Sequence, residues 1–170
     1  MTSPPARDGA GVQAEIGQRR PFHSLHAEVA VSILRTAALI ERHFAKVLAH
    51  ARLTPQQYNV LRILRGAGEE GVPTLVIRDR MIHEAPGITR LIDKLAKANL
   101  ARRERSVPDR RQVLCYITGP GLEVLQSLES DMKHADAAAV GRLTDGDERQ
   151  LLHLLEEVRA GHPRRARGLG

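Results

Sequence analysis

The chain has 170 residues, the size of one ordinary domain, and 42 % of them are hydrophobic while only 2 % are aromatic. A core without tryptophan must be built from Leu, Ile, Val and Ala, which favours packed helices over an aromatic platform for single-stranded nucleic acid. The net charge of +6 favours an anionic partner, either a phosphate backbone or a membrane surface.

Cysteine usage and hydropathy narrow the class of protein further. The single cysteine, Cys115, excludes a disulfide framework and a cysteine-based zinc site within one chain, and it fits a reducing cytosol. No apolar run approaches the roughly 20 residues of a membrane span, and residues 1–21 lack the apolar stretch of a signal peptide. We therefore expect a cytoplasmic protein without a membrane partner, with a disordered arm at 1–21 and a basic flexible tail at 161–170.

The first half of the chain is predicted to be helical. Apolar residues at three- and four-residue steps predict a long helix over 24–49, with Ser24 as its N-cap. Its apolar stripe is longer than one small domain needs, so part of it is expected to meet another subunit. Thr54 and Pro55 predict the start of a second helix, which ends near the glycines at 66–68.

Two shorter helices follow. The first is expected over 75–82. The second is expected to start near Ala85, with Pro86 at its first helical position, and to run to residue 98. Asn99 then suits a left-handed position just after the helix, where glycine is absent.

Two strand-like runs come next, over 100–105 and 112–117, and the charged segment 106–111 joins them as the tip of a β-hairpin. Thr118 can cap a helix that runs towards Val140, and Thr144 with Asp147 forms a capping pair before a last, Leu-rich helix.

The apolar stripe of the helix after Thr118 consists of Leu122, Leu125, Leu128 and Met132. The fold class is thus mainly α with a small β-hairpin wing. The order of short helix, turn, second helix and hairpin is that of a winged helix-turn-helix.

Positive charge is concentrated in the segment between Thr74 and Val113. It carries an excess of five positive charges, most of the total of +6. Its ten basic residues are Arg78, Arg80, Arg90, Lys94, Lys97, Arg102, Arg103, Arg105, Arg110 and Arg111. Basic groups that neutralise phosphates release counterions, which gives affinity without sequence specificity.

The helix over 85–98 is the candidate recognition helix. Its start, with Pro86 and Gly87, has little bulk and can approach base edges in the major groove. Thr89 offers a hydroxyl and a methyl group, and Arg90 can reach guanine or a phosphate. On spacing alone, Thr89 and Arg90 could equally be solvated helix residues.

The hairpin tip is the second candidate element. Arg110 and Arg111 stand at the end of a narrow ribbon, which can place a guanidinium in the minor groove. Asp109 would be unfavourable near phosphate unless it orients a neighbouring arginine. Taken alone, the tip is more simply read as a polar turn with incidental charges.

Five segments in order resemble the MarR family of transcription regulators. They are Leu53 to Leu61, Pro86 to Leu95, Asn99 to Arg103, Pro108 to Arg111, and Ile117 to Gly121. The Asp-Arg-Arg tip followed by the Thr-x-x-Gly step is the most specific part of the match.

The resemblance implies one domain over 22–160 that forms a homodimer. Helices at 24–49 and 121–160 would dimerise, and 54–118 would form the winged helix-turn-helix. Two recognition helices would enter successive major grooves of a pseudo-palindromic operator, about 34 Å apart. The implied DNA-binding residues are Pro86, Gly87, Thr89, Arg90, Lys94, Arg103, Arg105, Asp109, Arg110 and Arg111, with Arg111 the chief minor-groove contact.

Three positions depart from the family pattern. Asn99 stands where the family usually has glycine, and Arg78 stands where it usually has a small residue. The Arg78 side chain is expected either to snorkel outwards or to alter the packing of two helices. Ala85 stands where Ser or Thr commonly caps the recognition helix, so we expect a loss of about 1 kcal/mol of capping.

The resemblance also implies a ligand-responsive repressor of transcription and not an enzyme. The sequence shows no nucleophile elbow and no phosphate-binding glycine loop. No cofactor is implied, whereas a small anionic or aromatic molecule is expected as an effector. Two other functions stay open: a non-specific architectural DNA-binding protein, and a protein-interaction module that has kept the fold.

Metal and redox functions are weaker hypotheses. The eight histidines do not form a tight cluster with acidic residues in the sequence, although His23 and His26 could share a helix face. Cys115 is most simply a small, inert strand residue. Its arginine neighbours at 102–105 would lower the pKa of its thiol only if they point towards it.

Overall fold

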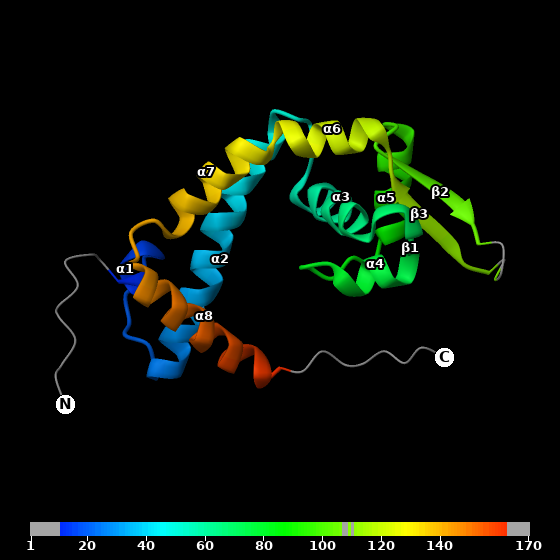
Figure 1. Ribbon diagram of the computed structural model, residues 1–170. Helices are drawn as coiled ribbons and strands as arrows, with labels where there is room; N and C mark the ends of the chain where they lie inside the picture. Colours follow the sequence, from blue (N-terminus) through cyan, green and yellow to red (C-terminus); the bar gives the residue numbers. More distant parts are fainter. Residues whose placement is uncertain (1–10, 107–108, 110, 163–170) are drawn as a thin grey trace. The chain divides into compact units, whose positions relative to one another are not determined.

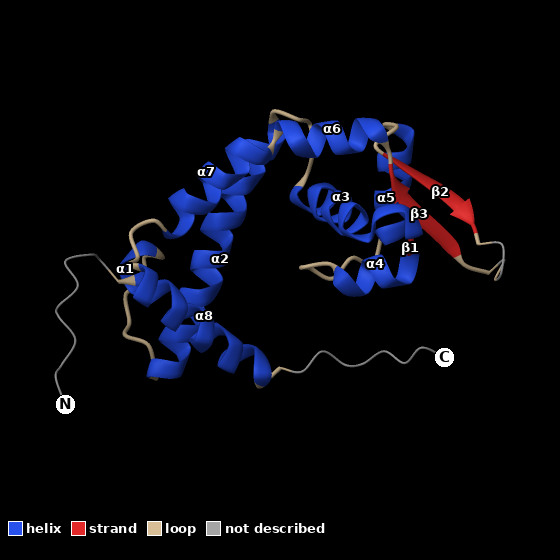
Figure 2. Ribbon diagram, viewed as in Figure 1, coloured by secondary structure: helices blue, strands red, loops and turns tan. Residues whose placement is uncertain are grey.

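The computed structural model describes residues 11–106, 109 and 111–162, whose helices and strands appear in Figures 1 and 2. The chain divides into two compact units between Glu129 and Ser130. The first unit holds helices α1 to α6 and a small sheet, and the second holds α7 and α8. Within the described ranges, no helix is both long and apolar enough to cross a membrane.

Helix α2 spans Leu25–Ala49, as predicted, and Ser24 Oγ caps it by accepting the Ala27 N–H at 3.2 Å. A short helix α1, Val12–Glu15, precedes it inside the segment that we expected to be disordered. The Glu15 carboxylate lies 3.3 Å from Arg35 Nε of α2. This ion pair links α1 to α2 across 20 residues of sequence, so no local sequence pattern could have indicated it. Residues 1–10 lie outside the described residues.

Helix α3 spans Pro55–Ala67 and begins at the predicted cap. Thr54 Oγ1 accepts the Gln57 N–H at 3.2 Å, and the Thr54 N–H donates to Gln57 Oε1 at 2.9 Å. This capping box satisfies two backbone donors at the helix start. The helix ends at Gly68, whose φ of 58° suits glycine, and a 3₁₀ turn over Gly68–Glu70 follows.

Three antiparallel strands form one sheet in the order β1-β3-β2. β2 (Ala101–Arg105) and β3 (Val113–Ile117) make the predicted hairpin, which extends away from the helices of its unit in Figure 2. β1 (Val72–Pro73) was not predicted, because two residues are too few to show the period of a strand. Since Val72 pairs with Cys115, β3 is the central strand.

Helix α5 spans Ile88–Lys97, and the prediction that Pro86 is its first residue was wrong. The Ile88 N–H donates to the Ala85 carbonyl at 3.1 Å, so Pro86 and Gly87 are the central residues of a tight turn. Gly87 is the N-cap, and Ala85 is buried before the turn. The capping loss expected at Ala85 therefore does not apply, because a glycine cap costs only a few tenths of a kcal/mol.

Helix α4 spans Thr74–Arg80 and is shorter than predicted. Its Ile77 side chain is fully buried. The neighbouring Arg78 reaches the surface, where its Nε lies 3.1 Å from Asp79 Oδ1 and 30 % of its side chain is exposed. The long side chain at this usually small position thus snorkels outwards and leaves the core intact.

The core of the first unit lies where α3, α4 and α5 meet. It is aliphatic, as the composition requires, and its fully buried side chains include Val60, Leu61, Leu64, Ile77, Ile92 and Leu95. These helices are labelled together beside the sheet in Figure 1. Because the core side of α5 is apolar, its polar side chains are directed outwards.

Helix α6 spans Gly119–Ser127 and is joined tightly to the end of α5. Thr118 Oγ1 accepts the Gly121 N–H at 3.1 Å and donates to the Asn99 carbonyl at 2.6 Å. Asn99 has a φ of 57°, which confirms the left-handed position predicted for it.

One helix was predicted from Thr118 towards Val140, and this prediction was wrong. Helix α6 ends at Ser127, and α7 spans Glu129–Val140. Ser127 Oγ donates to the Val124 carbonyl at 2.9 Å, and such back-bonding competes with the backbone ladder of a helix. Of the predicted apolar stripe, Leu125, Leu128 and Met132 are buried and Leu122 is 44 % exposed.

Helix α8 spans Asp145–Ala160 and starts at the predicted capping pair. Thr144 Oγ1 accepts the Asp147 N–H at 3.3 Å, and the Thr144 N–H donates to Asp147 Oδ2 at 3.2 Å. Thr144 Oγ1 also donates to Asp147 Oδ2 at 2.7 Å, and this bond, together with the one from the Thr144 N–H, lowers the pKa of the Asp147 carboxyl. No residue of α8 is buried, and its Leu-rich stripe is largely exposed.

The two glycines at the start of α6 make a matched pair for a stability test. A Cβ at Gly121 would lie 2.2 Å from the Leu100 carbonyl oxygen, whereas a Cβ at Gly119 would meet nothing within 4 Å. We expect Gly121→Ala to destabilise the protein by about 1–3 kcal/mol through overpacking. Gly119→Ala should be neutral or stabilising by up to about 1 kcal/mol. Urea denaturation measures both, and equal effects would contradict the close approach.

Candidate nucleic-acid interface

Helix α5 presents a polar face to solvent. Ile88, Ile92 and Leu95 are buried on its core side, whereas Thr89, Arg90 and Lys94 are exposed. Arg90 and Lys94 are four residues apart, so their side chains lie one above the other on the helix surface. Pro86 and Gly87, in the turn before the helix, are also exposed.

The turn between α4 and α5 is held by two contacts that the sequence analysis missed. Asn59 Oδ1 of α3 accepts the Ile82 N–H at 3.0 Å. His83 Nε2 lies 3.1 Å from the Glu41 carboxylate of α2. The only local signal for Asn59 is a polar side chain on an otherwise apolar stretch of helix. These contacts position the start of α5 from two other helices.

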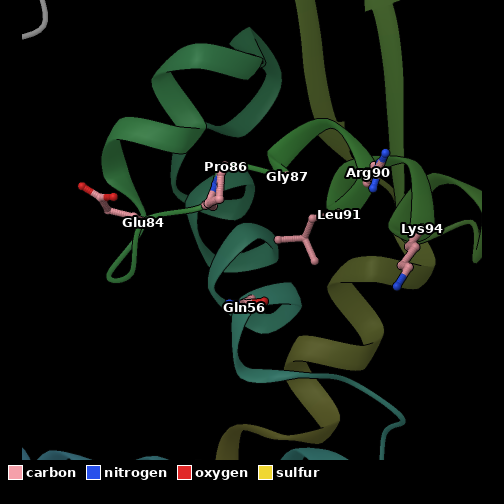
Figure 3. Close-up of a pocket in the computed structure, with 8 residues that line it drawn as sticks. Gln56, Glu84, Pro86, Gly87, Arg90, Leu91 and Lys94 are labelled. Atoms are coloured by element: carbon pink, nitrogen blue, oxygen red, sulfur yellow. The ribbon is translucent and has the colours of Figure 1, made fainter.

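A hollow of about 290 Å³ lies at the start of α5, beside the N-terminal turn of α3 (Figure 3). Its lining residues are Gln56, Glu84, Ala85, Pro86, Gly87, Arg90, Leu91 and Lys94. Four of them belong to the predicted DNA-binding set. Gln56 does not, because nothing in the sequence places the start of α3 next to α5.

The wing is tied to α5 by an ion pair. The Arg103 guanidinium of β2 binds the Asp93 carboxylate of α5. On the same strand, Arg102 pairs with Glu104, and its guanidinium lies 3.9 Å above the centre of the Tyr116 ring. Arg103 is therefore anchored to α5, while Arg105 is exposed further along β2.

The described part of the hairpin tip contains an ordered Asp–Arg arrangement. Asp109 Oδ1 accepts the Arg111 N–H at 3.0 Å and lies 3.8 Å from Arg111 Nε. The Asp109 N–H is 3.4 Å from Ser106 Oγ, a buried hydroxyl. The Arg111 side chain is 97 % exposed. Asp109 thus contacts both the backbone and the guanidinium of Arg111, which is the condition the sequence analysis set for an acidic residue near phosphate. Arg110 lies outside the described residues.

Cys115 is buried at the centre of the sheet, opposite Val72 and Arg103. Burial raises the pKa of its thiol above the ordinary 9.0, while Thr74 Oγ1 at 3.6 Å and the charge of Arg103 act in the opposite direction. Asp93 adds to the increase. The thiol is thus protonated at neutral pH and shielded from oxidants, unlike a redox-sensing thiolate.

In the described part of the chain, no group of three or more His, Cys, Asp or Glu side chains could hold a metal ion. His83, the histidine closest to the start of α5 in the sequence, contacts the Glu41 carboxylate.

A helix-turn-helix made by α4 and α5 and followed by a β2–β3 hairpin defines a winged helix-turn-helix protein. The comparisons agree with this class. The MarR family sequence profile matches residues 53–112. The HTH-type transcriptional regulator TtmR of Methylorubrum extorquens is 29 % identical over 87 % of this chain and 73 % of its own length.

Two crystal structures are similar over most of their length. A MarR transcription factor from Planctomyces limnophilus is 35 % identical, with a TM-score of 0.63 over 80 % of this chain and 98 % of that one. A MarR family regulator from Streptomyces coelicolor, solved in complex with DNA, has a TM-score of 0.75 at 22 % identity, over 87 % and 94 % of the two chains. The chain belongs to the MarR family of transcription regulators.

The raised thiol pKa has a consequence for stability. Above about pH 9 the unfolded chain loses a thiol proton that the native state retains, so the free energy of unfolding should fall as pH rises. We expect Cys115→Ala to remove this component of the pH dependence, even if the smaller side chain also lowers the overall stability of the protein. Urea denaturation of both proteins between about pH 8 and about pH 10 measures it. Parallel stability curves would contradict the burial of a neutral thiol.

Proposed function

We propose that this protein is a homodimeric, sequence-specific DNA-binding regulator of transcription. The observation that carries the proposal is the geometry of α5. Its apolar side is buried while Thr89, Arg90 and Lys94 face solvent, and the wing bound to it through Asp93 carries the exposed Arg111. These are the parts needed to read one groove and contact the next.

In this proposal α5 enters the major groove, which is about 12 Å wide and admits one helix. Arg90 contacts guanine or a phosphate, and Thr89 contacts a base edge through its hydroxyl or methyl group. Lys94 and Arg105 neutralise phosphates. The tip arginines reach the adjacent minor groove, with Arg111 oriented by Asp109.

A second copy of the chain is the proposed partner. Helix α2 exposes Leu25 (74 %), Val29 (46 %), Leu34 (70 %) and Leu39 (40 %), and α8 exposes Leu151 (40 %), Leu152 (59 %), Leu154 (52 %) and Val158 (44 %). Apolar side chains exposed in series indicate interaction surfaces. Both helices belong to the regions proposed to dimerise. We therefore propose one domain over 22–160, with the helices at 24–49 and 121–160 at the dimer interface.

Regulation is proposed to act through the spacing of the two recognition helices. A dimer bound across a promoter represses transcription by occluding it. A small anionic or aromatic effector that binds one arrangement of the dimer better than the other shifts the population between them. A differential affinity of a few kcal/mol is enough to change operator occupancy.

The test is fluorescence anisotropy of the full chain with duplexes from the region upstream of its own gene, at physiological salt. We expect one pseudo-palindromic site to bind about 10³-fold more tightly than random duplex. Binding should saturate at two chains per duplex, each of 18.8 kDa, as measured by light scattering of the complex. Equal affinity for all duplexes would indicate an architectural protein, and absent binding a protein-interaction module.

The wing assignment predicts a specific loss on Arg111→Ala. Removal of one phosphate or minor-groove contact should weaken operator binding by roughly five- to 100-fold and reduce the salt slope by about 1. Arg65→Ala is the matched control, because Arg65 is an exposed arginine in the last turn of α3 and does not line the hollow at the start of α5. If Arg111→Ala binds the operator with full affinity, the assignment of the wing to the DNA interface is wrong.

A further inference from the structure

We propose that Gln56, at the start of α3, is a further DNA-contacting residue that binds the phosphate backbone beside the groove entered by α5. The inference rests on the proposed function and extends the interface to a helix outside the recognition helix and the wing. It comes from the hollow at the start of α5, which Gln56 lines together with Arg90 and Lys94.

The position of Gln56 is fixed by the local structure of α3. Its neighbours Thr54 and Gln57 form the capping box, so both of their side chains are engaged in holding the helix start. The capping box thus fixes the backbone at Gln56, and its side-chain amide is exposed and makes no hydrogen bond within the described part of the chain.

The surroundings of the amide suit an anion. Arg90 and Lys94 stand on the α5 side of the hollow, and Leu91 lies between them and Gln56 (Figure 3). Glu84 is the acidic member of the lining, and its carboxylate points away from the two cations in Figure 3. The α5 side of the hollow therefore carries two cations and one apolar side chain, Leu91.

The geometry of the groove indicates which anion this is. A helix with its side chains is about 10–12 Å across, which fills a major groove about 12 Å wide. An element packed beside that helix therefore meets the sugar–phosphate strand at the edge of the groove. A neutral amide can donate to a phosphate oxygen and fix the register without reading sequence.

The decisive experiment adds a charge at this position. A lysine at residue 56 would neutralise one more phosphate, so Gln56→Lys should steepen the salt dependence of binding by about 0.9 in log–log slope. It should also tighten binding about three- to tenfold at low salt, equally for operator and random duplex. The measurement is fluorescence anisotropy of the full chain across a salt series.

Gln126→Lys is the matched control. Gln126 is an exposed glutamine on α6 in the same unit, outside the hollow, so the substitution changes the net charge identically. A slope change for Gln56→Lys above that of Gln126→Lys supports the proposal, and equal changes overturn it. If the wild-type chain does not bind duplex DNA, the proposed function itself fails, and with it this extension.

A second variant guards against a folding effect of lysine near a helix N-terminus. Gln56→Ala should weaken binding to both duplexes roughly two- to tenfold and leave the salt slope unchanged, because only a neutral hydrogen bond is lost. The melting temperatures of both variants are measured beside the wild type. Unchanged affinity of a folded Gln56→Ala protein would overturn the assignment.

Discussion

The packing of α5 against α3 is the constraint on which the whole surface depends. Ile88, Ile92 and Leu95 are buried on one side of α5, and each such side chain contributes about 1.5–3 kcal/mol relative to exposure. A ten-residue helix with one buried stripe has no freedom to rotate about its axis without exposing that stripe. The core therefore decides which side chains α5 offers to a partner, although no core residue reaches that partner.

The wing is held to this frame by a different kind of interaction. The Arg103–Asp93 ion pair joins β2 to α5. The buried Cys115 thiol lies on β3, the central strand of the sheet between β1 and β2. Because the pair is partly exposed, its Coulomb energy is modest, and it acts mainly by fixing geometry. The hairpin and α5 are thus joined directly, so the position of the wing is coupled to that of the helix proposed to enter the groove.

Charge alone does not identify which residues are placed to bind DNA in the proposed complex. The segment between Thr74 and Val113 has a clear positive excess, yet its cations differ in their surroundings. Arg78, Arg102 and Arg103 pair with acidic neighbours, whereas Arg90 and Lys94 are exposed around the hollow. A paired cation releases fewer counterions on binding, so the salt dependence should report Arg90 and Lys94.

The elements with local signals could be predicted from the sequence. Caps at Ser24, Thr54, Thr118 and Thr144, the left-handed Asn99 and the hairpin strands follow from side chains that act within a few residues of themselves. Other features arise from packing between distant segments: the pairing of β1 with β3, the contacts of Asn59 and Glu41 with the turn before α5, and the position of Gln56 in one hollow with Arg90. These features depend on residues that come from distant parts of the chain. The apolar core brings them together, and the periodic pattern of a sequence records the buried apolar positions but not which polar residues become neighbours.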